Sequence, residues 1–376
     1  MYSYEIVLPD IIDTDEFKKI IGFVSEEIIS FELKKSVLKI NLKRKDDNKE
    51  IQKTITELAS NFISSANMGS TIFLNEEKKK IYQHLNFAGV NKLDEGMICL
   101  DDKALFLYKY FDEVFKKIAF SADDNCIEKL YPVMLPTTQY KKTGYLRNSP
   151  QYALFCCCVC EDIKKLQNLE ANVDGNQIKK YLKYPKYALS PSACFHSYIE
   201  YQNKTLEKCQ LLTFTQSVFR NEGRFNYSEF GRLKDYHVRE IVLFGNMDYV
   251  VRKRMEIMNK AIQILKNFNL NGDVEVSADA FIVPKMQKYK KIQFFDKSKY
   301  EMHLKYQDKS KIAVASFNLH GTAFTDPFKI KINGCEEAVT GCVGFGLERW
   351  VLAFLSQYGT NVSEWPNQIK EEFYNE

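Results

Sequence analysis

The first ninety residues contain apolar positions at two different spacings. Some segments place an apolar residue at every second position, as strands do, and two others repeat them every three or four positions, as one face of a helix does. An aspartate precedes the first helical segment, as an N-cap does. The pattern predicts strand 2–9, helix 13–28, strands 29–36 and 37–44, and helix 47–64. This β-α-β-β-α series suits a small sheet with helices on one face.

The pattern changes near residue 97. An apolar stripe predicts a long helix over 104–122, and segment 129–140 resembles a short strand ended by prolines. Strand-like segments dominate from residue 180, and a further helix is predicted at 348–359. We therefore predict an α+β fold with a small N-terminal α+β domain at 1–92 and a larger domain at 97–376.

Composition agrees with this division and excludes several classes of protein. The chain has 376 residues, and at roughly 150 residues a domain this suggests about two domains. With 45% hydrophobic and 27% charged residues and a net charge of +4, collagen, long coiled coils, wholesale disorder and a dominant nucleic-acid-binding surface are excluded. We see no secretory signal and no apolar stretch near the roughly 20 residues of a membrane helix, so a cytoplasmic location is expected.

Ten cysteines in such a chain are expected to be mostly reduced thiols. Four of them, Cys156, Cys157, Cys158 and Cys160, lie in one apolar stretch. Neighbouring residues on one strand or helix cannot all converge on a single ion. We therefore interpret these four as small buried hydrophobic residues.

Residues 217–242 predict two antiparallel strands joined by a long polar loop. Side chains alternate along a strand, so Arg220 and Glu222 share one face. Arg224 and Arg232 in the loop, and Tyr236 on the returning strand, would suit a nucleotide, because arginine forks match phosphate oxygens. A surface hairpin with ordinary ion pairs is an equally good reading of these residues alone.

Residues 340–350 predict a strand, a glycine-rich bend and a helix. Gly344 and Gly346 let the backbone approach a ligand closely, and Arg349 falls in the first helical turn. Both features favour an anion. The bend lacks the lysine of a P-loop, so by itself it is weak evidence.

Together these segments resemble the class II aminoacyl-tRNA synthetases. Residues 217–242 match motif 2, residues 340–350 match motif 3, and the helix ending near 120 with the strand at 130–136 resembles the dimer-forming motif 1. The resemblance covers roughly residues 97–376. It implies an antiparallel sheet flanked by helices, a homodimer formed through motif 1, and the activation of an amino acid by ATP and Mg²⁺.

The resemblance also implies roles for the motif residues. Arg220 would hold the α-phosphate and the substrate carboxylate, and Glu222 would approach the adenine and ATP. Tyr236 would stack on the adenine. Arg232 and Arg349 would bind the terminal phosphates.

Cys194, Glu240 and Cys342 form a further group of interest. Taken singly, each cysteine is best interpreted as a core residue and Glu240 as a salt-bridged strand residue. The segments around them resemble a subgroup of class II enzymes, namely the atypical seryl-tRNA synthetases of methanogens and their shortened relatives, the amino acid:[carrier protein] ligases. That resemblance implies a Cys-Glu-Cys zinc site with one open position for the amino group of the substrate.

Three more residues are candidates for contact with substrate. Ser316 and Asn318 lie in a segment that resembles a strand these proteins place beside the substrate. Glu336 shares strand parity with Cys342, so it would reach Mg²⁺ or substrate. Strand packing or solvent exposure explains all three equally well.

We predict an AMP-forming, zinc-dependent ligase that activates a small amino acid and transfers it to the phosphopantetheine thiol of a carrier protein. The alternative is an atypical seryl-tRNA synthetase-like enzyme that charges tRNA. The carrier protein is preferred because the N-terminal unit is small and nearly balanced in charge, so tRNA is not expected. A non-catalytic synthetase paralogue is less consistent with motifs that keep their arginines and glycines.

Overall fold

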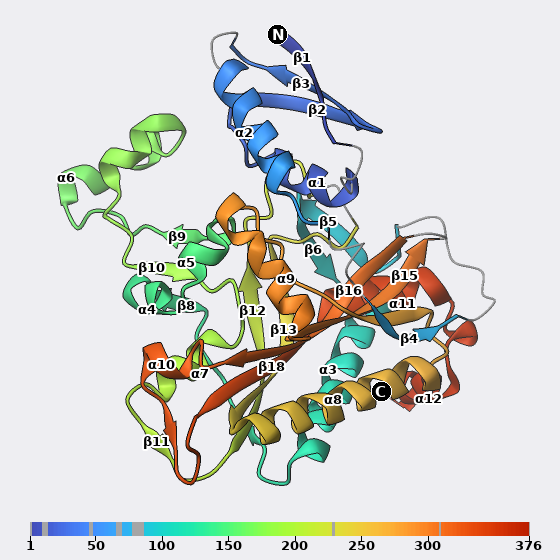
Figure 1. Cartoon of the computed structure of the whole chain (residues 1–376). Helices are drawn as coiled ribbons and strands as arrows, with labels where there is room; N and C mark the ends of the chain where they lie inside the picture. Colours follow the sequence, from blue (N-terminus) through green and yellow to red (C-terminus); the bar gives the residue numbers. More distant parts are fainter. Residues whose placement is uncertain are drawn as a thin grey trace.

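The computed structural model describes residues 2–9, 14–44, 48–64, 70–76, 86–227, 230–307 and 310–375. A large mixed sheet runs through the middle of the molecule, with a separate small sheet at the N-terminal end (Figure 1). Within the described ranges, no helix combines the length and the apolar character that crossing a membrane would require.

The central sheet has eight strands and is antiparallel except at one edge, where β7 runs parallel to β12. This arrangement agrees with the predicted α+β class and with an antiparallel sheet flanked by helices. In spatial order the strands are β4 (Thr71–Asn75), β14 (Gly272–Val276), β15 (Lys299–Gln307), β16 (Ser310–Gly321), β18 (Val339–Gly346), β13 (Asp235–Gly245), β12 (Gln210–Phe219) and β7 (Ile127–Glu128).

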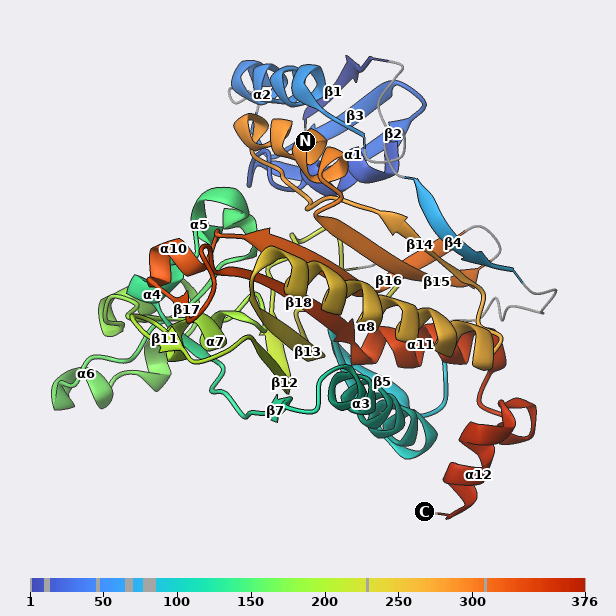
Figure 2. The same cartoon turned by 60° about the horizontal axis from the view of Figure 1, so that its bottom comes forward.

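One face of this sheet is covered by three helices, α3 (Asp102–Ala122), α8 (Met247–Asn267) and α11 (Leu347–Tyr358) (Figure 2). The main apolar core lies between the helices and the sheet. Alternation along the strands creates it: Val343 and Phe345 of β18 point into this core, and Phe345 stacks on Phe115 of α3 with ring centroids 4.2 Å apart. The long helix predicted over 104–122 is therefore α3, which begins two residues earlier.

The opposite face of the sheet is only partly covered. A second apolar cluster joins Val242 and Phe244 of β13 to α7 (Phe195–Glu200) and to a small sheet in the order β8-β10-β9. The remaining part of this face is open and lines a cavity, described below. The covering elements are β8 (Met134–Pro136), β9 (Leu154–Cys156), β10 (Tyr187–Leu189), α4 (Thr137–Lys142), α5 (Tyr145–Asn148) and α10 (Thr325–Phe328).

The four clustered cysteines are not buried, so that prediction is wrong. Cys157 and Cys158 are exposed, and Cys156 and Cys160 are only partly buried. The reason is that β9 is an edge strand of the small sheet, after which the chain leaves toward the projecting segment around α6 (Ile163–Leu166) (Figure 1). Apolar neighbours in sequence did not reveal that the strand lies at an edge.

The N-terminal unit has the predicted β-α-β-β-α order and its own apolar core. Strand β4, which follows it in sequence, pairs instead with β14 at the edge of the central sheet. The division at residues 92 and 97 remains a prediction. The unit consists of β1 (Tyr2–Val7), α1 (Thr14–Ile21), β2 (Ile28–Lys34), β3 (Val37–Leu42) and α2 (Asn48–Asn61), and its sheet order is β1-β3-β2.

The chain between the N-terminal unit and the long helix α3 forms a hairpin of β5 (Val90–Asp94) and β6 (Met97–Leu100). Beyond α11 the chain continues into α12 (Asn367–Asn375). The remaining short elements are α9 (Lys288–Phe295), β11 (Thr205–Leu206) and β17 (Lys331–Ile332).

Candidate active site

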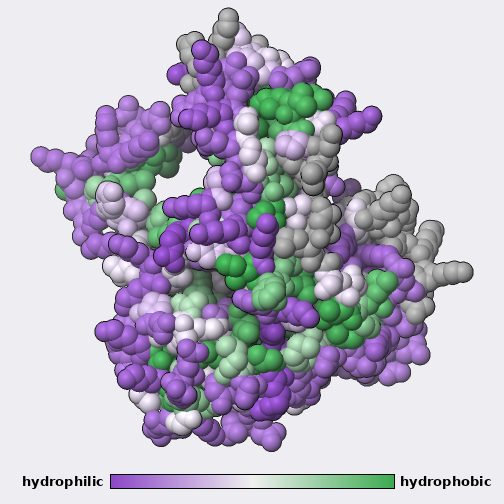
Figure 3. Space-filling view, in the orientation of Figure 1, coloured by the Kyte–Doolittle hydropathy of each residue, from purple (hydrophilic) through white to green (hydrophobic). Residues whose placement is uncertain are grey.

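A cavity of about 1690 Å³ lies over the open face of the central sheet. Its floor comes from alternate residues of β13, β16 and β18, and its walls come from α5, α9 and the loops around them. In Figure 3 the surface is hollowed in this middle region, while hydrophilic side chains dominate the N-terminal unit and the projecting segment around α6. Most of the predicted site residues line this cavity.

Strand register brings several of these residues into one row across the floor. Glu240 of β13 lies opposite Gly344 of β18, and Gly344 lies opposite Ser316 of β16. Asn318 lies opposite Cys342 in the next row. Because β18 is between β13 and β16, side chains from all three strands face the same space.

The glycine in this row is required by the carboxylate beside it. A β-carbon at Gly344 would come within 2.8 Å of a carboxylate oxygen of Glu240, closer than any ordinary contact. The bare backbone therefore gives the Glu240 side chain its place above the sheet.

Cys194, Glu240 and Cys342 meet at one point of the cavity. One ligand atom from each lies within 4.8 Å of the other two, and all three side chains are buried. Cys194 immediately precedes α7, so the chain reverses there and brings its sulfur down onto the sheet. Residues 148 positions apart thus share one pocket through the packing of α7 on β13 and β18.

The two thiols and the carboxyl group are close enough to shift one another's pKa values. A hydrogen bond from Cys342 lowers the pKa of the Cys194 thiol to about 7. That same bond, together with burial, raises the pKa of Cys342, and burial raises the pKa of Glu240 well above its ordinary range. Among the described residues, no lysine or arginine forms an ion pair with Glu240. The charge of Arg220 opposes this rise in the pKa of Glu240, but Arg220 does not form an ion pair with it. Two sulfurs and a carboxylate without an ion-pair partner are a donor set that fits Zn²⁺.

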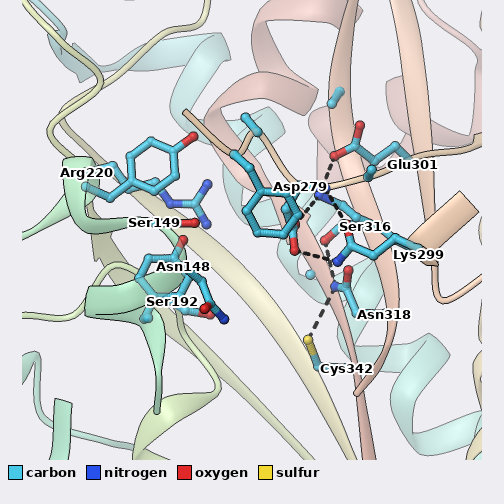
Figure 4. A pocket seen from close by; sticks show the side chains of 18 of the residues that line it. Asn148, Ser149, Ser192, Arg220, Asp279, Lys299, Glu301, Ser316, Asn318 and Cys342 are labelled. Atoms are coloured by element: carbon cyan, nitrogen blue, oxygen red, sulfur yellow. Dashed lines mark hydrogen bonds and ion pairs between the residues drawn. The ribbon is translucent and has the colours of Figure 1, made fainter. Parts of the chain in front are cut away.

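Other polar side chains hold the sulfurs in place. The Ser192 hydroxyl lies 3.3 Å from the Cys194 sulfur, and the Asn318 amide donates to the Cys342 sulfur over 3.5 Å. The His320 ring nitrogen Nε2 is also 3.5 Å from that sulfur. Figure 4 shows Asn318 pointing at Cys342 from the neighbouring strand. Metal-binding thiolates in proteins commonly receive such supporting hydrogen bonds.

Arg220 reaches into the cavity from the end of β12. Its Nε donates to the Pro191 carbonyl oxygen over 2.9 Å, and its guanidinium lies over the rings of Tyr152 and Tyr236, 5.1 and 5.9 Å from their centroids. These contacts fix the direction of the fork and leave its terminal nitrogens toward the cavity (Figure 4).

Arg349 also lies close to Tyr236. Its guanidinium is 5.7 Å from the Tyr236 ring centroid and donates to the carbonyl oxygens of Gly231 and Ala313. Burial lowers its pKa below the ordinary arginine value. Tyr236 therefore has two guanidinium groups near its ring, 5.9 and 5.7 Å from the centroid.

Glu222 and Arg232 form an ion pair at the same end of the cavity, with 2.9 Å between their closest atoms. The Glu222 side chain is buried, and both residues line the cavity together with Gly346. Apart from Arg224, which does not line the cavity, the predicted nucleotide residues of both motifs are thus gathered around one volume.

Of the three candidate substrate residues, two lie in the cavity and one does not. Ser316 and Asn318 line it, and the Asn318 amide donates to the Ser316 hydroxyl over 3.2 Å. Glu336 is exposed and lies outside the cavity lining. The parity argument failed for Glu336 because β18 begins only at Val339, so residue 336 belongs to the preceding turn.

A charged network that the sequence pattern did not reveal lies on the wall opposite Arg220. Lys299 pairs with Asp279 at 2.9 Å and with Glu301 at 3.0 Å (Figure 4). Burial opposes charging, but the two carboxylates outweigh it and raise the pKa of Lys299. Lys299 and Glu301 are two residues apart on β15, so strand alternation places them on the same face. This signal was available in the sequence, but paired charges at such a spacing usually indicate a strand face exposed to solvent.

A second acidic group reaches the same cavity through His303 alone. Asp273, Glu275 and His303 bring ligand atoms within 4.8 Å of one another. Here Lys311 pairs with both carboxylates, at 3.2 and 2.8 Å, and His303 Nδ1 lies 3.0 Å from Asp273. Side chains of the protein already supply the positive charge in this group.

The chain matches no family model, but it is similar to several known proteins. It is 30% identical over 277 residues to a type-2 serine–tRNA ligase of Methanocaldococcus jannaschii, covering 69% of this chain and 51% of the relative. A type-2 serine–tRNA ligase of Methanothermobacter thermautotrophicus is 26% identical over 276 residues, covering 70% and 52%. The chain spans about half the length of these relatives.

Solved structures agree on the fold. The chain superposes on M. kandleri SerRS, solved in complex with A. aeolicus tRNASec, with a TM-score of 0.71 at 18% identity, covering 99% of this chain and 77% of that one. Seryl-tRNA synthetase from Pyrococcus horikoshii, complexed with ATP, gives a TM-score of 0.56 at 12% identity, covering 80% and 64%. The fold is therefore that of the class II seryl-tRNA synthetases.

This chain is a class II aminoacyl-tRNA synthetase homologue related to the methanogen-type seryl-tRNA synthetases. The predicted transfer to a carrier protein is wrong, as is the expectation that tRNA is not a partner, because the relatives are tRNA ligases and the structural neighbour is bound to tRNA. The wrong prediction rested on the small size and balanced charge of the N-terminal unit. A small unit with balanced total charge need not lack a face that meets RNA, since net charge does not report how charges are distributed.

Proposed function

We propose that this protein activates serine with ATP and transfers the seryl group to the 3′ end of a tRNA. The single observation that best supports the proposal is the convergence of Cys194, Glu240 and Cys342 in the same cavity as the motif arginines. The relatives of this chain, named serine–tRNA ligases, support serine as the amino acid.

In this proposal the first step is an in-line displacement at the α-phosphorus of ATP. A carboxylate oxygen of serine forms a bond to phosphorus, and the bond from phosphorus to the bridging oxygen of pyrophosphate breaks. The protein must align two anions and neutralise charge that grows on the leaving group. Arg220 is suited to the first task because its fork is held by Pro191 and two rings with its terminal nitrogens toward the cavity.

Arg232 and Arg349 are suited to the leaving pyrophosphate, together with Mg²⁺ brought in by ATP. Arg349 is held by two backbone carbonyls, so little ordering remains when phosphate arrives. Arg232 is held by Glu222. Homodimer formation through the motif 1 elements belongs to this proposal as well, since the chain keeps the long helix α3 that the resemblance assigns to it.

We assign Cys194, Glu240 and Cys342 as ligands of Zn²⁺. When bound, the ion would supply an open coordination position for the neutral amino group of the substrate. The protein's own residues do the rest of the selection. Asn318 donates to the Cys342 sulfur and to the Ser316 hydroxyl, and both residues line the cavity, where they can hydrogen-bond a small hydroxylated side chain.

The second step moves the seryl group from AMP to tRNA. The terminal ribose hydroxyl attacks the carbonyl carbon of the adenylate, the new ester bond forms, and AMP leaves with the electrons of the broken bond. The residues that align the carboxylate in the first step also hold the carbonyl in the second, so Arg220 serves both.

Pyrophosphate exchange followed by a charging assay tests the proposal. We expect exchange with serine, and none with glycerate, which has the same hydroxymethyl group but no amine. With tRNASer the product should be an ester-linked seryl-tRNA. Absence of serine-dependent exchange, or an adenylate that never charges tRNA, would overturn the proposed function.

A pair of arginine variants provides the internal control. Arg220→Ala should lower exchange about 10²–10³-fold, because it removes a preorganised cation from the reacting phosphate. Arg252→Ala should leave exchange unchanged, since Arg252 is an exposed residue of α8 on the helix-covered face of the sheet. Equal loss in both variants would argue that the effect is on folding.

A further inference from the structure

The loop between β12 and β13 is fastened to the N-terminal unit. Arg224, at the turn of this loop, points away from the cavity, although its sequence position suggested a phosphate contact. Its guanidinium donates to three backbone carbonyls between α1 and β2: Gly22 at 3.3 Å, Ser25 at 2.9 Å and Ile28 at 2.8 Å. The fork thus ties together three carbonyls of the segment that leads from the end of α1 to the first residue of β2.

Neighbouring loop residues add to the same contact. Phe225 packs edge-on against Phe31 of β2 with ring centroids 5.4 Å apart, and the Arg224 guanidinium lies 4.6 Å from the Phe225 ring centroid. A β-carbon on Gly22 would come within 3.0 Å of the Phe225 ring. A β-carbon on Gly223 would come within 2.7 Å of Phe23. The two surfaces therefore fit closely, with glycine on both sides.

Asn226 links this contact to the cavity. Its amide nitrogen donates to the Lys19 carbonyl of α1 at 3.1 Å and to the Glu222 carbonyl at 2.6 Å. Glu222 in turn holds Arg232 through its carboxylate. A continuous series of bonds thus joins α1 to the residues at the phosphate end of the cavity.

We propose that Arg224 and Asn226 are positioning residues, which use the N-terminal unit to hold the loop so that Glu222 and Arg232 face the nucleotide. This inference deepens the proposed function, because it assigns the N-terminal unit a role in binding ATP. When the fastening is lost, the loop occupies its binding conformation for a smaller fraction of the time. The apparent affinity for ATP falls in proportion to the fraction of molecules whose loop is in the binding conformation.

The test measures two properties of Arg224→Ala: the dissociation constant for ATP, and amide hydrogen exchange of peptides covering 221–227 and 230–234. We expect ATP binding to weaken about tenfold and exchange in the loop to accelerate. Zinc content and the KM for serine should stay the same. Arg224→Lys should give an intermediate result, because a lysine cannot reach three carbonyls with a planar fork.

Lys34→Ala is the matched control. Lys34 is an exposed cation of the same unit and pairs with Glu32 on its own strand, so neither property should change. Asn226→Ala tests the link to Glu222 independently of Arg224 should that first variant fold poorly. It should weaken ATP binding as well.

Unchanged exchange in the loop would overturn the fastening, and unchanged ATP affinity with faster exchange would overturn the positioning role. If the wild-type chain binds no ATP at all, the proposed function fails. The exchange experiment still decides whether the loop is held by Arg224.

Discussion

Two groups of side chains in the described chain are close enough together to hold a metal ion, and they differ in what neutralises them. Asp273, Glu275 and His303 are accompanied by Lys311, which pairs with both carboxylates. Cys194, Glu240 and Cys342 are equally close together and more deeply buried, yet no basic side chain of the described chain pairs with Glu240. Burying acidic groups without a cation is costly. The first group is therefore complete as it stands, whereas the second is suited to an external cation.

The largest expected effect is loss of metal from the cysteine group alone. Wild-type protein should carry about one zinc per chain, and Cys342→Ala should carry none and lose serine-dependent pyrophosphate exchange, because it keeps only two of the three protein ligands that an open zinc site needs. Elemental analysis of the purified proteins measures this directly. Asp273→Asn is the control from the other group and should keep its zinc. Full zinc content in Cys342→Ala would remove the distinction between the two groups.

A smaller change keeps all three donors and moves one of them. In Gly344→Ala the new β-carbon would lie 2.8 Å from a Glu240 oxygen, so the carboxylate must shift away from the sulfurs. We expect zinc affinity to fall about 10–100-fold, the size of effect that follows when a supporting contact of a ligand is lost. Competition with a chromophoric chelator measures it. Gly346→Ala is the control, because a β-carbon at Gly346 would have no atom within 3.4 Å. Gly334 is unsuitable as a control because its backbone φ is positive, a conformation that strains alanine.

Strand parity predicted much of the floor of this site from sequence. Tyr236 and Glu240 share a face of β13 and line the cavity, whereas Ile241 and Leu243 have the opposite parity and lie in the helix-covered core. Parity fails where a strand ends, which is why Glu336 lies outside the cavity. The order β-α-β-β-α and the helix α3 were also predictable, because their spacing is local.

Long-range contacts were not predictable from spacing. Nothing local indicates that β4 pairs with β14, some two hundred residues later, or that Lys299 and Asp279 face Arg220 across the cavity. Cys194 and Cys342 became candidates through resemblance to a family, since an isolated cysteine in an apolar segment is usually a core residue. Arg224 was assigned to phosphate because the sequence could not reveal that its loop lies against the N-terminal unit.

The acidic group that is neutralised by the protein should show its own pH dependence. Burial disfavours charged His303, but hydrogen bonds to Asp273 and Glu301 outweigh it and raise the pKa of His303 from 6.5 to about 9. Its contribution to stability is therefore complete below pH 6.5 and is lost as pH rises through about 9. A shift of this size corresponds to roughly 3 kcal/mol in the free energy of unfolding.

Urea unfolding across this pH window tests that expectation. Glu275 and Lys311 also face His303, so the comparison must be with a variant that changes His303 alone. In His303→Gln the fall in the free energy of unfolding over this range should be much smaller than in the wild type. If both proteins lose stability in parallel, the imidazolium is not the source.

The smallest expected effect follows from removing the lysine that completes the acidic group. Lys311→Met should lower the free energy of unfolding by only about 1 kcal/mol, because the Lys311 side chain is 38% exposed and its ion pairs are partly screened by water. The sign of a second change is more informative. Lys311 repels the His303 imidazolium and lowers its pKa, so its loss should raise that pKa further. NMR titration of the His303 ring would then show its midpoint moving upward from about 9, whereas a downward shift would mean that Lys311 does not neutralise this group.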